Sequence, residues 1–220
     1  MANYSKPDYF AIKAQKEGYP ARSVYKLKEM DEKFGLLQFC KGHASPFRVL
    51  DLGAAPGSWS LYMLRKIAGR AKNSGAVQAP VAAPSLVSVD LAPLSRQYDE
   101  GLFDKPEFFY IQGDFTQGKT REEILVRGPF NLLVSDAAPS TTGNRSIDTI
   151  RSLELAETAL NYVESALTKG GSFVVKVFQG GDTGNLLKQI RGLFDSGKSF
   201  KPQACRSESF ETYYLGLGKR

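Results

Sequence analysis

The sequence predicts an α/β fold, in which helices cover both faces of a mainly parallel sheet. Short apolar runs typical of buried strands alternate with helix-like patterns through most of the 220 residues, and this alternation is typical of parallel sheets. The first such strand leads through a Gly- and Pro-containing turn into a helix, and carboxylates follow several strand ends. With 42% hydrophobic residues the chain can bury one core. We therefore expect a single domain over residues 1–220.

The N-terminal part of the chain is predicted to be helical and basic. Residues 7–34 contain two short helical patterns, separated at Gly18-Tyr19-Pro20. In the second, apolar residues recur every three or four positions and form one face. We expect residues 1–46 to be a basic helical extension that packs on the core.

The predicted sheet has seven strands. Five follow one another in an alternating series: Phe47–Leu52, Leu86–Asp90, Phe108–Ile111, Phe130–Val134 and Phe173–Phe178. Phe200–Cys205 and Thr212–Leu217 have no helix between them, which predicts a hairpin and an antiparallel strand at one edge. A long helix is expected over Ile147–Leu167, and the Ala-, Gly- and Pro-rich stretch Gly69–Pro84 is expected to be a loop.

Composition excludes several classes of protein. No apolar run is long enough to span a membrane, and residues 1–8 lack the apolar core of a secretion signal. Cys40 and Cys205 are far apart, and His43 is the only histidine, so neither a metal site nor a disulfide framework is expected. We expect a soluble, cytoplasmic monomer without a metal or a membrane partner.

The net charge of +6 is concentrated at the two ends of the chain. Residues 1–28 contain six basic and two acidic residues, and residues 185–220 contain seven basic and three acidic ones. A solvated surface is the commoner reason for any single basic run, but two basic ends favour a polyanionic partner. The leading candidate is a nucleic acid.

The turn after the first strand, Asp51-Leu-Gly-Ala-Ala-Pro-Gly-Ser-Trp59, resembles a nucleotide-binding corner. Gly53 and Gly57 allow a sharp turn and a close approach to the backbone. The turn lacks both G-x-G-x-x-G and the Gly-Lys-Ser/Thr of a P-loop, so neither a dinucleotide nor an NTP is favoured. On the turn alone, an ordinary Gly-containing βα turn is equally plausible.

Carboxylates at strand ends favour the binding interpretation. Asp51, Asp90, Asp114 and Asp136 each lie at or just after a predicted strand, where ligands bind in such sheets. Each could singly be a helix cap. Together they suit an adenosine without phosphates: Asp90 would accept ribose hydroxyls, Asp114 would accept from an exocyclic amine, and the acidic pocket would favour a cationic sulfonium.

Lys176 interrupts the apolar strand Phe173–Phe178. A buried ammonium is costly unless it is paired or deprotonated. Two explanations remain open: a structural ion pair with a carboxylate, and a general base that has lost its proton.

Several motifs in this order resemble the FtsJ/RrmJ family of ribose 2′-O-methyltransferases. They are Arg22-Ser-Val-Tyr-Lys26-Leu27, the Asp51–Trp59 turn, Ser135-Asp136-Ala-Ala-Pro139 and Gly170-Gly-Ser-Phe-Val-Val-Lys-Val-Phe-Gln179. The resemblance spans Tyr9 to Gly218. It implies a Rossmann-like fold, S-adenosylmethionine as the cofactor, and a Lys-Asp-Lys-Glu catalytic set.

Carried over residue by residue, the resemblance implies three groups of site residues. The catalytic set is Lys26, Asp136, Lys176 and Glu211, with Glu208 as the alternative for the last position. The cofactor-binding residues are Gly57, Trp59, Asp90, Asp114 and Asp136. The basic extension, residues 1–46, is expected to contribute to RNA binding, and the RNA-binding residues are Lys13, Lys16, Arg22 and Lys26.

The resemblance implies 2′-O-methylation of RNA, and the compact layout favours a uridine in the A-loop of 23S large-subunit rRNA. A tRNA anticodon-loop methyltransferase and a catalytically inactive RNA-binding module stay open as alternatives. An amino-group methyltransferase would favour an Asn/Asp-Pro-Pro-aromatic turn in place of residues 135–139, which the chain lacks. An oxidoreductase would need the missing pyrophosphate fingerprint.

Overall fold

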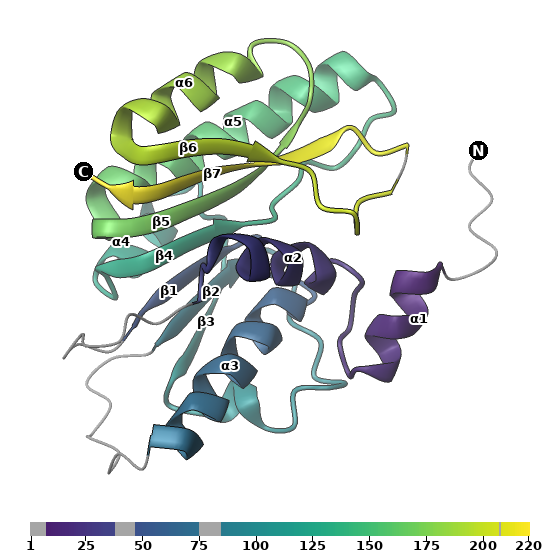
Figure 1. Ribbon diagram of the computed structural model, residues 1–220, viewed down its shortest axis with the longest axis vertical. Helices are drawn as coiled ribbons and strands as arrows, with labels where there is room; N and C mark the ends of the chain where they lie inside the picture. The colour runs from purple at the N-terminus through teal and green to yellow at the C-terminus, as the bar shows by residue number, and fades with distance from the viewer. Residues whose placement is uncertain (1–7, 38–46, 75–84, 207) are drawn as a thin grey trace.

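A seven-stranded sheet with helices on both faces forms the molecule in the computed structural model, which describes residues 8–37, 47–74, 85–206 and 208–220 (Figure 1). The strand order is β3-β2-β1-β4-β5-β7-β6. Only β7 runs antiparallel to its neighbours in this described sheet, and it lies next to the edge strand β6. The predicted fold class is confirmed.

The sheet consists of β1 (Val49–Leu52), β2 (Leu86–Asp90), β3 (Phe108–Gln112), β4 (Phe130–Ser135), β5 (Leu167–Phe178), β6 (Phe194–Phe200) and β7 (Glu211–Lys219). The helices are α1 (Tyr9–Lys16), α2 (Val24–Phe34), α3 (Ser58–Ser74), α4 (Gly118–Leu125), α5 (Arg145–Ala166) and α6 (Thr183–Leu193), with a 3₁₀ turn η1 (Leu102–Asp104). The carboxyl ends of β1 to β5 share one edge of the sheet, because these strands are parallel.

Two hydrophobic cores lie on opposite faces of the sheet, because successive strand residues point to opposite sides. On β1, Val49 packs in the core with α1, α2 and α3, whereas Leu50 and Leu52 pack in the core with α4, α5 and α6. Strands buried on both faces read as continuous apolar runs, which explains the pattern found in the sequence.

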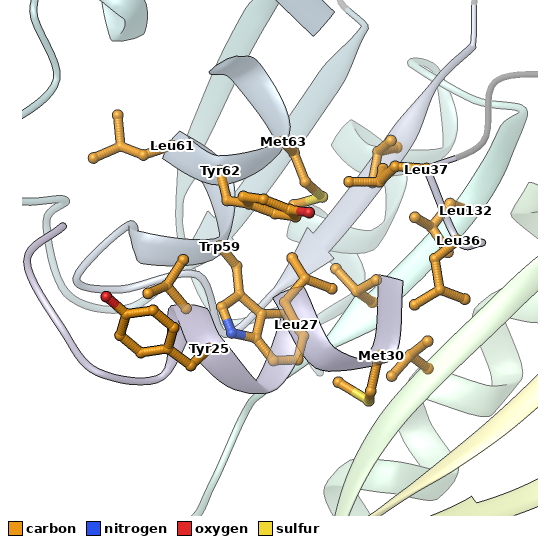
Figure 2. Packing of buried hydrophobic residues seen from close by; sticks show 14 of the residues in the cluster. Tyr25, Leu27, Met30, Leu36, Leu37, Trp59, Leu61, Tyr62, Met63 and Leu132 are labelled. Atoms are coloured by element: carbon orange, nitrogen blue, oxygen red, sulfur yellow. The ribbon is translucent and has the colours of Figure 1, made fainter. Parts of the chain in front are cut away.

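Helix α2 packs against α3 through the apolar face that its periodicity predicts. Val24, Leu27 and Met30 are fully buried, and Trp59 and Tyr62 of α3 lie against this face (Figure 2). The two helical segments of the N-terminal extension are therefore anchored on the same face of the sheet.

The predicted hairpin is wrong in its first strand. β6 spans Phe194–Phe200 and follows α6 directly, whereas residues 201–206 form a turn-rich connection to β7. The buried Phe194 begins this strand, but Asp195-Ser-Gly-Lys-Ser breaks the apolar run and hides its strand character. An edge strand needs only one apolar face, so its sequence signal is weak.

Helix α3 is longer than expected, because it continues through Gly69 to Ser74. The prediction of a loop over Gly69–Pro84 is therefore wrong for residues 69–74, which are helical. Residues 75–84 lie outside the described residues, as do Cys40 and His43. Helix α5 ends at Ala166, close to the predicted end. No helix of the described chain is long and apolar enough to cross a membrane.

Candidate active site

An acidic cavity of about 850 Å³ opens at the carboxyl ends of the parallel strands. Its lining includes Asp90 at the end of β2, Asp114 after β3 and Asp136 after β4, together with Phe115. The sheet therefore brings together three of the predicted carboxylates, although they are far apart in the chain.

The Gly-containing turn forms one wall of this cavity. Gly53 has a φ of +75°, and a Cβ at this position would lie 2.6 Å from Cα of Ala137. A side chain there would therefore push the turn away from the segment that carries Asp136. Asp90 holds the same turn, because its carboxylate accepts the backbone N–H of Ala55 at 2.9 Å.

Asp114 is ordered by its own loop. Its Oδ1 accepts the backbone N–H of Thr116 at 2.9 Å and the Thr116 hydroxyl at 2.8 Å. Burial alone would raise the pKa of Asp114, but these hydrogen bonds outweigh it and lower the pKa. The carboxylate therefore stays ionised at neutral pH and presents a fixed negative charge in the wall of the cavity.

Asp51 does not join the other three carboxylates, contrary to the expectation from strand ends. It is fully buried inside β1, and its Oδ2 accepts the hydroxyl of Ser60 at 2.7 Å. Burial raises its pKa to about 7. Asp51 therefore belongs to the packing between β1 and α3, and the residues that line the cavity do not include it.

Gly57 and Trp59, which were expected to contact a cofactor, do not line the cavity. The Trp59 side chain is buried, and its indole N–H donates to the carbonyl of Ser23 at 2.8 Å. Next to it, the Ser58 hydroxyl accepts the N–H of Ala21 at 2.8 Å. These two bonds fasten the start of α3 to the turn that precedes Lys26.

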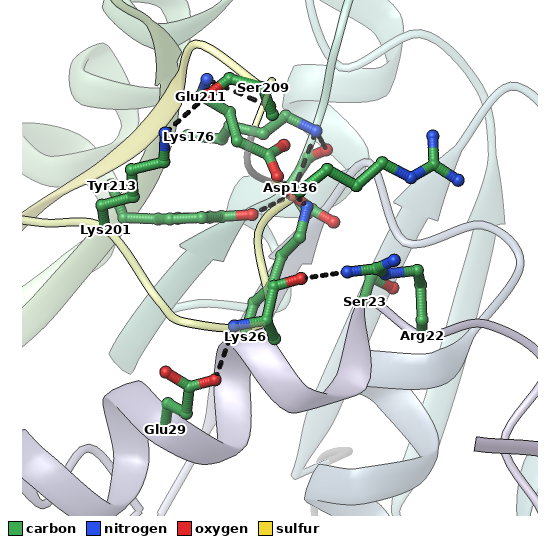
Figure 3. A network of polar contacts seen from close by, with 12 residues as sticks. Arg22, Ser23, Lys26, Glu29, Asp136, Lys176, Lys201, Ser209, Glu211 and Tyr213 are labelled. Carbon is green, nitrogen blue, oxygen red and sulfur yellow. Dashed lines mark hydrogen bonds and ion pairs between the residues drawn. The ribbon is translucent and has the colours of Figure 1, made fainter. Parts of the chain in front are cut away.

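Two lysines and two acidic residues meet beside the cavity (Figure 3). Lys176 Nζ lies 3.0 Å from Oδ1 of Asp136, and Lys26 Nζ lies 2.7 Å from Oε1 of Glu211. All four side chains are largely buried, with exposed fractions of 8–16%. The structure thus assembles the four predicted residues from α2, the β4 end, β5 and β7. It also pairs Glu211, the preferred candidate over Glu208, with Lys26.

The neighbouring charges hold two members of this cluster, Asp136 and Lys26, in the ionised state. Burial alone would raise the pKa of Asp136, but Lys176, Lys26 and the Tyr213 hydroxyl together lower it. Burial alone would lower the pKa of Lys26, and the carboxylates of Asp136 and Glu211 outweigh this and raise it. Lys26 is therefore a fixed cation, and Asp136 is a fixed anion.

Tyr213 is a member of the cluster that the sequence did not reveal. Its hydroxyl donates to Oδ1 of Asp136 at 2.7 Å, and the register of the sheet pairs it with Lys176. Burial, followed by the nearby Asp136 and Glu211, raises its pKa well above the usual value, so the hydroxyl keeps its proton. The available signal was its position two residues after Glu211, on the same face of a strand.

The predicted RNA-binding residues fall into two groups. Lys13 and Lys16 lie on α1 with exposed side chains, and Lys13 Nζ lies 4.7 Å from the centre of the Tyr25 ring. Arg22 is instead largely buried: its guanidinium pairs with Asp8 and donates to the carbonyl of Ala204. Arg22 therefore joins the N-terminal extension to the connection before β7.

The described residues contain no group of three or more His, Cys, Asp or Glu residues placed to hold a metal ion. A sheet with this strand order, an antiparallel strand beside its edge, and an acidic cavity at its carboxyl ends defines the Rossmann-like methyltransferase class. At the level of the fold alone, human methyltransferase-like protein 13 in complex with SAH has the same architecture, with 14% identity, a TM-score of 0.51, and coverage of 93% of this chain and 80% of that one.

The chain belongs to the FtsJ-like methyltransferase family, whose model matches residues 19–219. It is 49% identical to the ribosomal RNA large subunit methyltransferase E of Treponema denticola, over 97% of this chain and 96% of the relative. The protein of the same name from Borrelia garinii is 40% identical over 97% of both chains. A crystal structure of a protein described as a ribosomal RNA methyltransferase, from Plasmodium falciparum, has 25% identity and a TM-score of 0.67, and covers 91% of this chain and 98% of that one.

Proposed function

We propose that this methyltransferase transfers the methyl group of S-adenosylmethionine to a ribose 2′-hydroxyl of large-subunit ribosomal RNA, with Lys176 as the general base. The observation that carries the proposal is the largely buried pair of Lys176 and Asp136, which lies at the cavity and next to the Lys26–Glu211 pair (Figure 3). Full-length similarity to relatives named for ribosomal RNA supports the choice of RNA.

The cavity residues fit this cofactor. Asp90 and Asp114 present carboxylate oxygens from neighbouring strands, which suits the ribose hydroxyls and the adenine amino group, and Phe115 adds an apolar surface. The acidic lining also suits the positive charge of a sulfonium. When bound, S-adenosylmethionine supplies an electrophilic methyl group.

Lys26 would bind and orient the RNA rather than accept a proton. Its pKa is raised and Glu211 pairs with it, so it stays cationic and can attract the phosphate or hydroxyl of the target nucleotide. Lys26 is only 12% exposed, so this charge acts where little water competes with it.

Lys176 is the amine that remains for the base role. Its Nζ would take the proton of the 2′-hydroxyl as the oxygen bonds to the methyl carbon and the carbon–sulfur bond of the sulfonium breaks, which would leave neutral S-adenosylhomocysteine, while Asp136 stabilises the ammonium that results. The Tyr213 hydroxyl donates to the same Oδ1 of Asp136, so the acceptor of this ammonium is already in place.

Lys176→Arg tests the base role directly. A guanidinium keeps the charge but cannot give up its proton near neutral pH. We expect single-turnover methyl transfer to fall by about 100- to 10,000-fold in both Lys176→Arg and Lys176→Ala, while cofactor affinity stays near the wild-type value. Near-normal activity of the arginine variant would reject the base role.

Mapping 2′-O-methyl groups in RNA from cells that lack this protein tests the substrate. We expect one site in large-subunit rRNA to disappear, a uridine of the A-loop, and to return with the wild-type gene but not with Lys176→Ala. Loss of an anticodon-loop site in tRNA would identify the alternative substrate. An unchanged map would favour an RNA-binding module without catalysis.

A further inference from the structure

Phe210 is an aromatic side chain at the site that methyl transfer itself does not use. It directly precedes Glu211 and is half-buried. Its ring centre lies 4.7 Å from that of Phe178, and the two planes are tilted by 58°. The packing against Phe178 holds the ring on one side and leaves part of it accessible.

The sheet register places Phe178, against which Phe210 packs, two residues from Lys176 on β5. Phe178 pairs with Glu211 and Lys176 pairs with Tyr213 across β5 and β7. Alternate residues of a strand share a face, so Lys176 and Phe178 both point to the face that carries the charged cluster. Phe178, the packing partner of Phe210, therefore follows Lys176 along the face of the amine that would meet the ribose.

Arg145, the first residue of α5, adds a cation to this wall. Its side chain is exposed, and its guanidinium carbon lies 5.0 Å from the centre of the Phe210 ring. The backbone under the ring is held on both sides: the N–H of Gln179 donates to the carbonyl of Phe210 at 2.8 Å, and Lys201 Nζ donates to the carbonyl of Ser209 at 2.6 Å. The backbone that carries the Phe210 ring is therefore held in place before any ligand arrives.

We propose that Phe210 and Arg145 form a stacking platform for an unpaired RNA base within one nucleotide of the methylated ribose. This inference rests on the proposed function. Proteins bind unstacked RNA bases by placing them on aromatic rings and guanidinium planes, and arginine also pairs with the adjacent phosphate. The platform would hold the target strand on the β5–α5 side, whereas the lysines of α1 lie on the other side of the cluster.

Phe210→Leu tests the platform, because it keeps an apolar group against Phe178 but removes the π face. The matched control is Phe109→Leu on β3, at the far edge of the sheet, where the guanidinium of Arg127 lies 3.7 Å from the ring centre. We expect Phe210→Leu to weaken binding of a fluorescein-labelled single-stranded RNA, and to lower kcat/KM on large ribosomal subunits, by about tenfold or more. Phe210→Tyr should restore both, and Phe109→Leu should change neither.

Salt dependence separates the roles of the two residues. Phe210→Leu should leave the slope of log affinity against log salt unchanged, whereas Arg145→Gln should reduce it by about one phosphate contact. Wild-type RNA affinity in Phe210→Leu, or an equal loss in Phe109→Leu, would overturn the platform. If Phe210→Leu strongly lowers the melting temperature, the platform is tested with Phe210→Tyr and Arg145→Gln instead. An Arg145→Gln variant with unchanged RNA affinity and unchanged salt slope would then reject the platform. A wild-type protein that binds RNA but methylates no subunit would reject the proposed function and not the platform.

Discussion

The carboxylate of Glu29 on α2 accepts the backbone N–H of Ala204 at 2.8 Å, across 175 positions of the chain. Its other oxygen accepts the N–H of Gln203 at 2.7 Å, and Arg22 donates to the carbonyl of Ala204. Between Arg22 and Glu29, Lys26 reaches Glu211. The segment from Arg22 to Glu29 therefore contacts the connection to β7 and the first residue of β7 at three points, and the Lys26–Glu211 ion pair is the middle one.

We expect Glu29→Ala to slow methyl transfer without changing cofactor affinity. The two N–H groups would lose their acceptor, at a cost of about 1–3 kcal/mol in stability, and the segment that positions Glu211 would loosen. Glu29→Gln should recover part of the activity, because it retains one acceptor oxygen. Single-turnover rates and hydrogen exchange at residues 203–206 measure the effect. Glu32→Ala, an exposed position on the same helix, is the control; equal exchange in both variants would contradict the prediction.

The central strands and Lys176 were predictable from the sequence for a physical reason, whereas Lys26 and Glu211 were implied only by the family resemblance. Buried parallel strands read as apolar runs, and Lys176 is conspicuous within one because a buried charge is costly. Tyr213 was missed, because its position two residues after Glu211 becomes informative only once the register between β5 and β7 is known. The structural role of Arg22 was hidden similarly, because Asp8 and Ala204 meet it only in the folded chain. The bounds of the edge strand β6 were not predicted, because a strand with a single buried face has few apolar residues.

Replacing both Lys13 and Lys16 with glutamine should weaken RNA binding and reduce its salt dependence. On α1, Lys16 is exposed and the Lys13 side chain is 41% exposed. Removing one lysine–phosphate pair should reduce the slope of log affinity against log salt by roughly one. The matched control replaces Lys169 and Lys188, which are exposed on β5 and α6. Cofactor affinity should stay constant in both double variants. If the two slopes fell equally, general charge and not an α1 contact would be responsible.

Asp90→Ala should weaken S-adenosylmethionine binding more than the loss of one hydrogen bond would. The carboxylate lines the cavity and also accepts the N–H of Ala55, so the variant removes both a hydrogen-bond acceptor for the ligand and the anchor of the Gly-containing turn. We expect a cost in binding of about 1–3 kcal/mol for each unpaired group, measured by calorimetry. Asp104→Ala removes an exposed carboxylate outside the cavity and should bind normally. Wild-type affinity in Asp90→Ala would remove this residue from the cofactor site.

Asp51 should make the protein less stable as the pH rises from about 4 to about 7. Its Oδ1 is buried without a hydrogen-bond partner among the described residues, and burial raises its pKa to about 7, from an ordinary value of 3.8. Between these two pH values the folded chain holds a proton that the unfolded chain has released, so the free energy of unfolding falls with rising pH. Three pH units correspond to at most about 4 kcal/mol.

Asp51→Asn removes this titration, because the amide is neutral at every pH and its oxygen can still accept from Ser60. The free energy of unfolding of the variant minus that of the wild type, from urea titrations at several pH values, should therefore rise from pH 4 to pH 7 and level off above. The control Asp195→Asn changes an exposed carboxylate and should give a nearly flat difference. A flat difference for Asp51→Asn as well would mean that Asp51 has the same pKa in the folded and unfolded chains, and that its burial is compensated by a partner.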